Sequence, residues 1–498
     1  MFTVQGLVAL VLGVAIGLVM GAIPGLTGTM AIALLIPLTY FLPPIIVMPA
    51  LVGMYKGSIC GGSIPAILIN TPGTPAAAAT ALDGYALTKQ GKSGKALRMA
   101  LYSSFCGDTF SDLVLIMVAA PLAALALKFG PTELAALIVF SLMMVAVIAT
   151  MGSPIKGLIS GAAGFLLGMI GLDPINATSR LEFGMVELSG GLELMPFLIG
   201  LLALSEVFMQ MGKSADMSRL ITNADVGKSN RREDNRVLWK EFKGCIKTIL
   251  RSSCIGTFLG ALPGLGPTVA AYLGYGEAMR NSKRPEEFGK GSLEGVAACE
   301  AANNAVCGAN LIPLVTLGIP GDLNAAVLLG AFMVHGMQPG PLMMRDQAPL
   351  LYGLFLGLLA ANVIYLVLGS LFIKGAAKIA FLPVKYIMPA VAVLCLVGAY
   401  ANSFSIFDVW VAVVFGVVGY LMNKLGFSPP AMLIAFILAP MLENHARTAL
   451  LIHEGQWSIF LTKPISLAFL LITVLIMISV FMRQRKRSRQ LQEGHVSG

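Results

Sequence analysis

Charged side chains are scarce in this sequence. Of its 498 residues, 12% are Asp, Glu, Lys or Arg, whereas 57% are hydrophobic and the mean hydropathy is +0.83. Soluble proteins carry about 25% charged residues, and residues 1–82 here contain a single one, Lys56. A soluble multidomain protein and a disordered chain are therefore excluded. The sequence predicts an all-α polytopic membrane protein.

Patterns that hold metals or perform catalysis are scarce as well. There are four His, and the seven Cys form no CxxC pair, so neither a metal site nor a disulfide scaffold is expected. The sequence has no HExxH, GxSxG or DDxxD motif, which argues against a protease, a lipase or a prenyltransferase within the membrane. We therefore expect no enzyme activity and no cofactor.

Charge-free runs recur along the chain at the length that crosses a bilayer, about 20 residues. Together with their Pro interruptions they predict about 10–13 spanning or half-spanning elements. The net charge of +9 comes from basic segments between these runs, which the positive-inside rule explains without a nucleic-acid partner. The basic linker 213–247 and the basic tail 483–498 are therefore expected in the cytoplasm.

An internal repeat divides the membrane part of the chain. Glycines, prolines and their neighbours recur in the same order in both halves, at spacings of 239, 248 and 255 residues. The matched segments are Gly17–Thr29 with Gly256–Thr268, Ile64-Pro65 with Ile312-Pro313, and Gly161 and Gly164 with Gly416 and Gly419. We expect a first transmembrane repeat over 1–212 and a second over 248–445.

The orientation of the repeats follows from the basic segments. The first repeat ends just before the cytoplasmic linker, whereas an extra helix with its preceding loop, 446–482, separates the second repeat from the cytoplasmic tail. The two repeats are therefore predicted to have inverted topology. Inverted repeats with broken helices are typical of secondary transporters.

Two interrupted segments at matching repeat positions, 57–75 and 303–322, are predicted to form re-entrant hairpins that bind substrate. Free N–H groups and the positive dipole end of the helix after each turn suit a carboxylate, and released carbonyls could coordinate Na⁺. The alternative is that these are interfacial turns whose Asn residues cap helices; the pairing favours binding. The candidate residues are Ser63, Asn70, Thr71, Pro72, Gly73 and Thr74, and Asn303, Asn304, Thr316, Gly318, Pro320, Gly321 and Asp322.

Two Pro-Gly pairs and one isolated Lys are further candidates for structural or binding roles. Pro24 with Gly25, and Pro263 with Gly264, are predicted structural hinges. Lys56 either pairs with an anionic substrate or extends to a lipid headgroup. No metal site is expected other than Na⁺ at the hairpin carbonyls.

The first hairpin resembles a known family. The segment GGSIPAILINTPGTPAAAATALDGYALTKQGKSGKAL, which ends at Leu97, is similar to the signature of the large membrane subunit of tripartite tricarboxylate transporters, the TctA type. Glu300-Ala-Ala-Asn303-Asn304, Leu317-Gly-Ile-Pro320-Gly321 and His335-Gly-Met-Gln-Pro339 agree with it, so the resemblance covers nearly the whole chain.

This resemblance implies a subunit of the bacterial inner membrane that takes up a tricarboxylate such as citrate, or a dicarboxylate. It implies a Na⁺ or H⁺ gradient as the driving force, a periplasmic substrate-binding protein and a small four-helix membrane subunit. An elevator-like form of alternating access is the expected mechanism. A homodimer is one possible oligomeric state. A passive anion channel or exporter without ion coupling is the alternative function.

Overall fold

The computed structural model describes residues 3–40, 42–148, 153–173, 175–211, 232–373 and 384–496. Residues 213–231 of the predicted linker and the last two residues of the predicted tail lie outside the described residues. Two compact units are present, one made of Met1–Ala123 and Met195–Tyr420, the other of Ala124–Leu194 and Leu421–Gly498. Each unit takes segments from both halves of the sequence.

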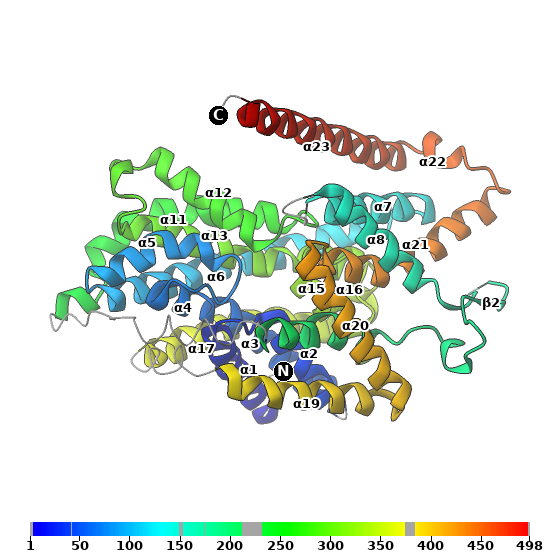
Figure 1. The fold of residues 1–498 in the computed structure, drawn as a ribbon, viewed down its shortest axis with the longest axis horizontal. Coiled ribbons are helices and arrows are strands. Elements are labelled where there is room, and N and C mark those ends of the chain that lie inside the picture. Colours follow the sequence, from blue (N-terminus) through cyan, green and yellow to red (C-terminus); the bar gives the residue numbers. More distant parts are fainter. Residues whose placement is uncertain are drawn as a thin grey trace. The chain divides into compact units, whose positions relative to one another are not determined.

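The first unit is built from helices (Figure 1). They are α1 (Val4–Ala22), α2 (Gly28–Thr39), α3 (Pro44–Gly61), α4 (Ser63–Ile69), α5 (Ala77–Lys89), α6 (Ser93–Ala126), α9 (Leu194–Leu198), the π-helical turn η2 (Ile199–Leu204), η3 (Arg232–Asn235), α11 (Trp239–Gly260), α12 (Gly266–Asn281), η4 (Pro285–Glu287), α13 (Leu293–Ala309), α14 (Leu311–Leu317), α15 (Leu323–Val334), α16 (Met343–Asp346), α17 (Ala348–Phe372), α19 (Val384–Ser403) and α20 (Ile406–Leu425).

In its described part, the second unit has five further α-helices and two very short strands. They are α7 (Pro131–Ile148), α8 (Pro154–Gly168), β1 (Gly171–Leu172), β2 (Ser179–Arg180), the 3₁₀ turn η1 (Val186–Leu188), α21 (Pro429–Ile452), α22 (Ile459–Thr462) and α23 (Pro464–Val496). The strands pair antiparallel, with Gly171 opposite Arg180. α21 continues past 445, the predicted end of the second repeat.

The helices are long and apolar enough for a membrane. Within the described ranges, seven have the length and composition to cross one, and five shorter apolar helices accompany them. Large apolar side chains stay exposed along the first half of α23, among them Leu471, Leu475 and Ile478. Exposed apolar surface of this kind suits lipid rather than water. The prediction of an all-α polytopic membrane protein is confirmed.

Close glycine contacts join the first helices of each half. An added Cβ on Gly17 of α1 would lie 2.5 Å from the carbonyl oxygen of Met54 on α3, and one on Gly256 of α11 would lie 2.2 Å from that of Ala302 on α13. Met54 and Ala302 are themselves 248 residues apart, the spacing of the repeat. α1 therefore packs on α3 through the same positions by which α11 packs on α13 (Figure 1).

The second helix of each half packs on the opposite half. Thr29 at the start of α2 donates a hydrogen bond of 2.5 Å to the amide oxygen of Asn324 on α15. Ala271 of α12 packs in turn against Ala76 and Ala79 at the start of α5. This reciprocal exchange ties each half to the helix that follows the other half's interrupted segment.

A charge cluster anchors the loop after α8 in the second unit. Asp173 accepts hydrogen bonds from the backbone N–H groups of Asn176 and Ile175 and from Arg447, which hold the pKa of Asp173 down at about 2. Arg180 forms a two-pronged ion pair with Glu443, at 2.7 and 3.1 Å. Glu443 is thus neutralised within its own unit.

The glycine contacts generate a matched test on one helix. Gly256→Ala should lower the stability of the protein by about 1–3 kcal/mol, because the new methyl group meets a backbone carbonyl that cannot move without shifting α13. The measurement is the midpoint of thermal unfolding of the purified protein in detergent.

Gly244→Ala on the same helix is the control, because nothing lies within 4 Å of the added methyl group. It should leave stability unchanged or raise it by up to about 1 kcal/mol through better helix propensity. Equal unfolding midpoints for the two variants would contradict the α11–α13 contact.

Candidate functional site

The first interrupted segment breaks at Asn70. α4 ends there because Asn70 adopts a left-handed conformation, with φ of 56°, which Asn tolerates better than most residues. The chain then runs irregularly until α5 begins at Ala77. The backbone N–H of Gly73 bonds to the Gly62 carbonyl at 3.1 Å, which folds the break back onto the α3–α4 junction.

The second interrupted segment has the same design. α14 ends at Gly318, whose φ is 73°, and α15 begins at Leu323 with Asp322 as its N-cap. The Ile319 N–H bonds to the Pro313 carbonyl at 3.2 Å, as the Thr71 N–H bonds to the Pro65 carbonyl at 3.3 Å. Both interrupted segments therefore consist of a helix, a turn and a second helix, and their turns are equivalent.

Glycine is required in each break for the same steric reason. A Cβ on Gly73 would lie 3.0 Å from the Cα of Gly62, and one on Gly321 would lie 3.0 Å from the Cα of Asn310. Gly62 and Asn310 are again 248 residues apart. The turns are thus pressed against the same point of the preceding helix in both halves.

The two breaks differ in exposure. In the first, Asn70 and Pro75 are exposed and Thr71, Pro72 and Thr74 are half-buried, whereas Gly318 to Asp322 of the second are all buried. The connection between α11 and α12 covers the second break, because the Gly264 N–H bonds to the Gly321 carbonyl at 2.8 Å.

The predicted hinges lie in the short connections between helices. Pro24 and Gly25 separate α1 from α2, and Pro263 and Gly264 separate α11 from α12. Gly25 and Gly264 have φ values of 87° and 89°, which favour glycine at both positions. Whether these connections move stays a prediction.

A buried hydrogen-bond chain holds the second break. The amide nitrogen of Asn310 donates to the Tyr55 hydroxyl at 2.9 Å and to the Asp322 carboxylate at 2.8 Å. Asp322 also caps α15 by accepting from the Ala325 N–H at 2.8 Å. The chain connects α3 of the first half to the break of the second half.

Asn303 is a polar side chain without a partner. It is 1% exposed, and neither its amide nitrogen nor its amide oxygen has a hydrogen-bond partner among the described residues. Residues four apart share a helix face, so Asn303 lies on the face of α13 that carries Cys299 and Cys307. Cys299 packs against Ala76, directly after the first break.

Other predicted residues have their polar groups occupied. The hydroxyl group of Ser63 donates to the Cys60 carbonyl at the end of α3 at 2.9 Å, and that of Thr316 donates to the Ile312 carbonyl of its own helix at 2.6 Å. Thr71 donates to the Ile69 carbonyl at 3.3 Å, and Thr74 accepts from the Ala77 N–H at 3.4 Å. No hydrogen bond found in the described part of the chain joins the two breaks directly.

Lys56 is fully buried inside an ion cluster. Its ammonium group lies 2.6 Å from Asp108 and 2.9 Å from Asp112, both on α6 and both 0% exposed. Tyr365 and Asn362 of α17 donate to the same carboxylates at 3.0 and 2.7 Å. The expectation that Lys56 extends to a headgroup is wrong, because its side chain does not reach the surface.

Glu300 is a further buried acid, and sequence reasoning assigned it no role. It is 0% exposed on α13, where Thr80, Ser104 and Asn304 donate to its carboxylate at 2.5, 3.0 and 3.2 Å. Asn304, predicted to bind substrate, therefore contacts a carboxylate of its own chain.

A signal for the missed acids existed in the sequence. Asp108 and Asp112 are the only acids between Asp83 and Glu133, and they stand four residues apart, on one face of a helix. A pair of acids on one face of an apolar helix calls for a buried partner, and Lys56 is the single charge in residues 1–82.

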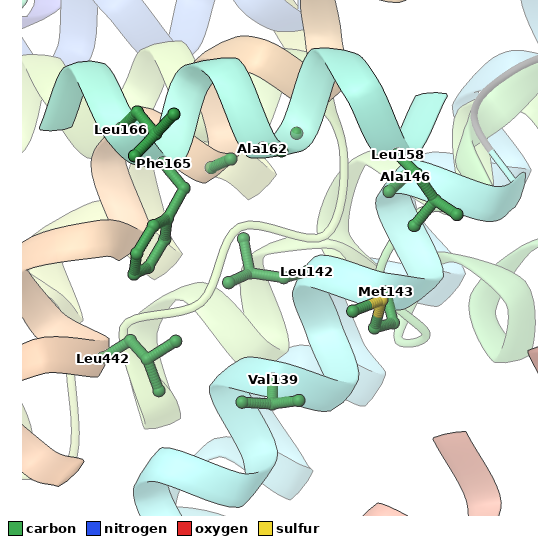
Figure 2. Close-up of a pocket in the computed structure, with 11 residues that line it drawn as sticks. Val139, Leu142, Met143, Ala146, Leu158, Ala162, Phe165, Leu166 and Leu442 are labelled. Atoms are coloured by element: carbon green, nitrogen blue, oxygen red, sulfur yellow. The ribbon is translucent and has the colours of Figure 1, made fainter. Parts of the chain in front are cut away.

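The second unit contains an apolar cavity of about 530 Å³ between α7, α8 and α21. Figure 2 shows Phe165, Leu142 and Leu442 around it, and every side chain that lines it is apolar. Ligand sites for polar molecules contain a few convergent polar groups. This cavity therefore suits a hydrocarbon chain and not a carboxylate.

A polar cavity of about 690 Å³ lies in the first unit, lined by Lys and Arg from the start of α6, from α11 and from the loop after α12, together with Glu241, Glu287 and Glu294. Lys240 and Lys247 belong to the linker that is predicted to face the cytoplasm, so the positive-inside rule accounts for their charge.

The chain matches the model of the tripartite tricarboxylate transporter TctA family over residues 7–434. It belongs to the TctA family. It is 36% identical over 459 residues to an uncharacterized 52.8 kDa protein in the TAR-I ttuC' 3' region of Agrobacterium vitis, which is 92% of this chain and 89% of that protein. An uncharacterized protein in the TAR-II ttuC' 3' region of the same organism is 36% identical over 215 residues, 43% of this chain and 89% of its own length.

No solved structure matches this TctA-family chain. Membership implies that it is the large subunit of a tripartite tricarboxylate transporter and a multi-pass membrane protein. Proteins of this family generally operate with a periplasmic binding protein and a small membrane subunit. The family is one of transporters, which implies transport rather than catalysis.

Removing the buried ammonium group should destabilise this TctA-family protein strongly. Lys56→Met leaves two carboxylates in an apolar interior without a cation, which costs about 3–5 kcal/mol. Little folded protein should be recovered in detergent, as measured by size-exclusion chromatography and thermal unfolding.

Two further variants test the cause. Combining Lys56→Met with Asp108→Asn and Asp112→Asn removes all three charges and should restore most of the folded protein. Arg284→Met breaks an exposed ion pair with Glu287 and should change stability by at most about 1 kcal/mol. A Lys56→Met protein as stable as the wild type would contradict the cluster.

Proposed function

We propose that this TctA-family protein carries an organic carboxylate, a tricarboxylate or a dicarboxylate, into the cell by secondary active transport. Its membrane is the bacterial cytoplasmic membrane, with the C-terminus on the cytoplasmic side. The periplasmic binding protein delivers the substrate, and a Na⁺ or H⁺ gradient supplies the energy.

The unpartnered amide of Asn303 carries this proposal. An unpaired polar group in an apolar interior costs about 1–3 kcal/mol, so a ligand that satisfies both amide atoms gains the corresponding free energy. The amide nitrogen would donate to a carboxylate, and the amide oxygen would accept from a substrate hydroxyl group. Asn303 is a candidate substrate-binding residue because it lies on α13, the helix that leads to the second break.

An inverted relation between the repeats supports a shared site at both breaks. Tyr55 corresponds to Asn303 and Gly62 to Asn310, since both pairs are 248 residues apart. A two-fold axis would therefore match the Tyr55–Asn310 hydrogen bond with a contact between Asn303 and Gly62, the residue on which the first break folds. Asn303 and Asn310 are seven residues apart, a rise of about 10 Å along a helix, which one small carboxylate and its polar contacts can bridge.

Alternating access fits the difference between the breaks. The first break is open at Asn70 and Pro75 while the second is covered, as expected when one side of the site is closed. Both breaks belong to one compact unit, which an elevator-like carrier needs in the body that holds its substrate. In the opposite state of the transport cycle, the first break would be covered and the second break would be open.

The test is Asn303→Leu, which replaces the amide by an apolar side chain of similar size. Uptake of labelled citrate or a labelled dicarboxylate into vesicles that contain all three subunits should fall at least about tenfold, the equivalent of one hydrogen bond. The unfolding temperature should stay the same or rise, because an unsatisfied buried group is removed.

Asn281→Leu, an exposed position at the end of α12, is the control and should leave uptake unchanged. Normal uptake by Asn303→Leu would overturn the site. Flux that continues without an ion gradient and without the binding protein would instead favour a passive channel or an exporter.

A further inference from the structure

Glu300 is a buried negative charge without a positive partner. None of the ion pairs formed within the described ranges includes Glu300, and its carboxylate receives only hydroxyl and amide donors. Buried charges normally persist only when another charge or a bound ion balances them. A cation at Glu300 would supply that balance.

The neighbouring amide has an acceptor to spare. The amide nitrogen of Asn304 donates to Glu300 and to Ser104, whereas its amide oxygen has no partner and Asn304 is 0% exposed. Turning the amide by 180° would place this oxygen where the nitrogen now lies, 2.8 Å from Ser104 Oγ and 3.2 Å from Glu300 Oε2. Side chains from α5, α6 and α13 would then place oxygen atoms around the Glu300 carboxylate, Thr80 at Oε1 and Ser104 and Asn304 at Oε2.

The repeat shows what occupies the matching place in the other half. Asn304 corresponds to Lys56, 248 residues earlier. The Lys56 ammonium group is held by Asp108 and Asp112 of α6, the helix that also supplies Ser104. In the first half, the cation is the ammonium group of Lys56. In the second half, the neutral side chain of Asn304 stands at the corresponding position, beside the oxygen atoms that could bind a free cation.

We propose that the oxygens of Glu300, Thr80, Ser104 and Asn304 bind Na⁺, the coupling ion of the proposed carboxylate uptake. Carboxylate, hydroxyl and amide oxygens are hard ligands that suit hard cations. A single carboxylate balances one positive charge and favours a monovalent ion over Ca²⁺, whose sites usually contain several carboxylates. This inference rests on the proposed function only for the ion's role in transport.

The position of the site explains how the ion would act on the substrate. Thr80 lies in the first turn of α5, directly after the first break, and Glu300 lies one helical turn from Asn303. An ion shared by Thr80 and Glu300 ties α5 to α13 and fixes the helix face that presents Asn303. Na⁺ bound here therefore prepares the carboxylate site.

Na⁺ binding is measured on the purified full-length protein in detergent without carboxylate. The unfolding temperature should rise by several degrees on adding NaCl, relative to KCl or choline chloride at the same ionic strength. Glu300→Gln should abolish the Na⁺-specific rise, because it keeps the shape of the side chain and removes its charge. Glu286→Gln, an exposed acid, should keep the full rise.

Ser104→Ala is a milder variant in case Glu300→Gln does not fold. It removes one ligand oxygen and should raise the NaCl concentration for half-maximal stabilisation about tenfold. A wild-type protein that NaCl and KCl stabilise equally, or a Glu300→Gln protein that keeps the Na⁺-specific rise, overturns the proposal. A stability that depends on pH through Glu300 with no response to Na⁺ also overturns it and identifies a proton as the ion.

The same experiment separates this inference from the proposed function. Na⁺-specific stabilisation without any carboxylate uptake would leave the site standing and remove its transport role. Carboxylate uptake by a protein that does not bind Na⁺ would remove the site and leave the transport function standing.

Discussion

The ion cluster around Lys56 is the constraint on which the first unit depends. An ammonium group and two carboxylates are buried together, and each needs the others because an unpaired charge in an apolar interior is far too costly. The three charged side chains come from α3 and α6, and α17 adds hydrogen bonds from Tyr365 and Asn362. The cluster thereby fixes the rotation of these helices. α3 leads through the short helix α4 to the first break, and that break folds back onto the α3–α4 junction, so the rotation of α3 also sets where the break lies.

Repetition of the same packing in both halves is the second organising feature. Gly17 meets Met54 as Gly256 meets Ala302, and the two breaks close on Gly62 and Asn310. Because both halves use the same helix packing, a contact that breaks in one half can be replaced by an equivalent contact in the other. A conformational change in which the two halves swap their surroundings therefore costs little free energy. Alternating access needs near-equal free energies for its two states. If the protein works by the proposed alternating access, the exposure of the first break and the burial of the second would mark one of its two states.

A feature of this structure could be predicted from the sequence when the residues that determine it are close together along the chain. The breaks were predictable because Pro-Gly turns, and an Asn or Gly that adopts positive φ, are local properties of the sequence. The partners of Lys56 were not predicted, since Asp108 and Asp112 are more than 50 residues away and only the fold selects their helix. The role of Glu300 depends on Thr80 and Ser104, about 200 residues away. Composition predicts that a buried polar residue needs a partner, but not which residue supplies it.

The two buried clusters together suggest why the cation should bind before the substrate. Asp108 and Asp112 outnumber Lys56, and Glu300 adds another negative charge, bound to Ser104, which lies one helical turn before Asp108 on α6. A carboxylate bound at Asn303 would lie about 6 Å from Glu300, where two like charges repel by about 3 kcal/mol at the effective dielectric constant of protein sites. That repulsion lowers the affinity roughly a hundredfold, and a cation at Glu300 removes it. Because linkage is reciprocal, the substrate must then tighten cation binding by the same factor. If Na⁺ binds at Glu300 as proposed, electrostatics alone would couple the two affinities, without a direct contact between ion and substrate.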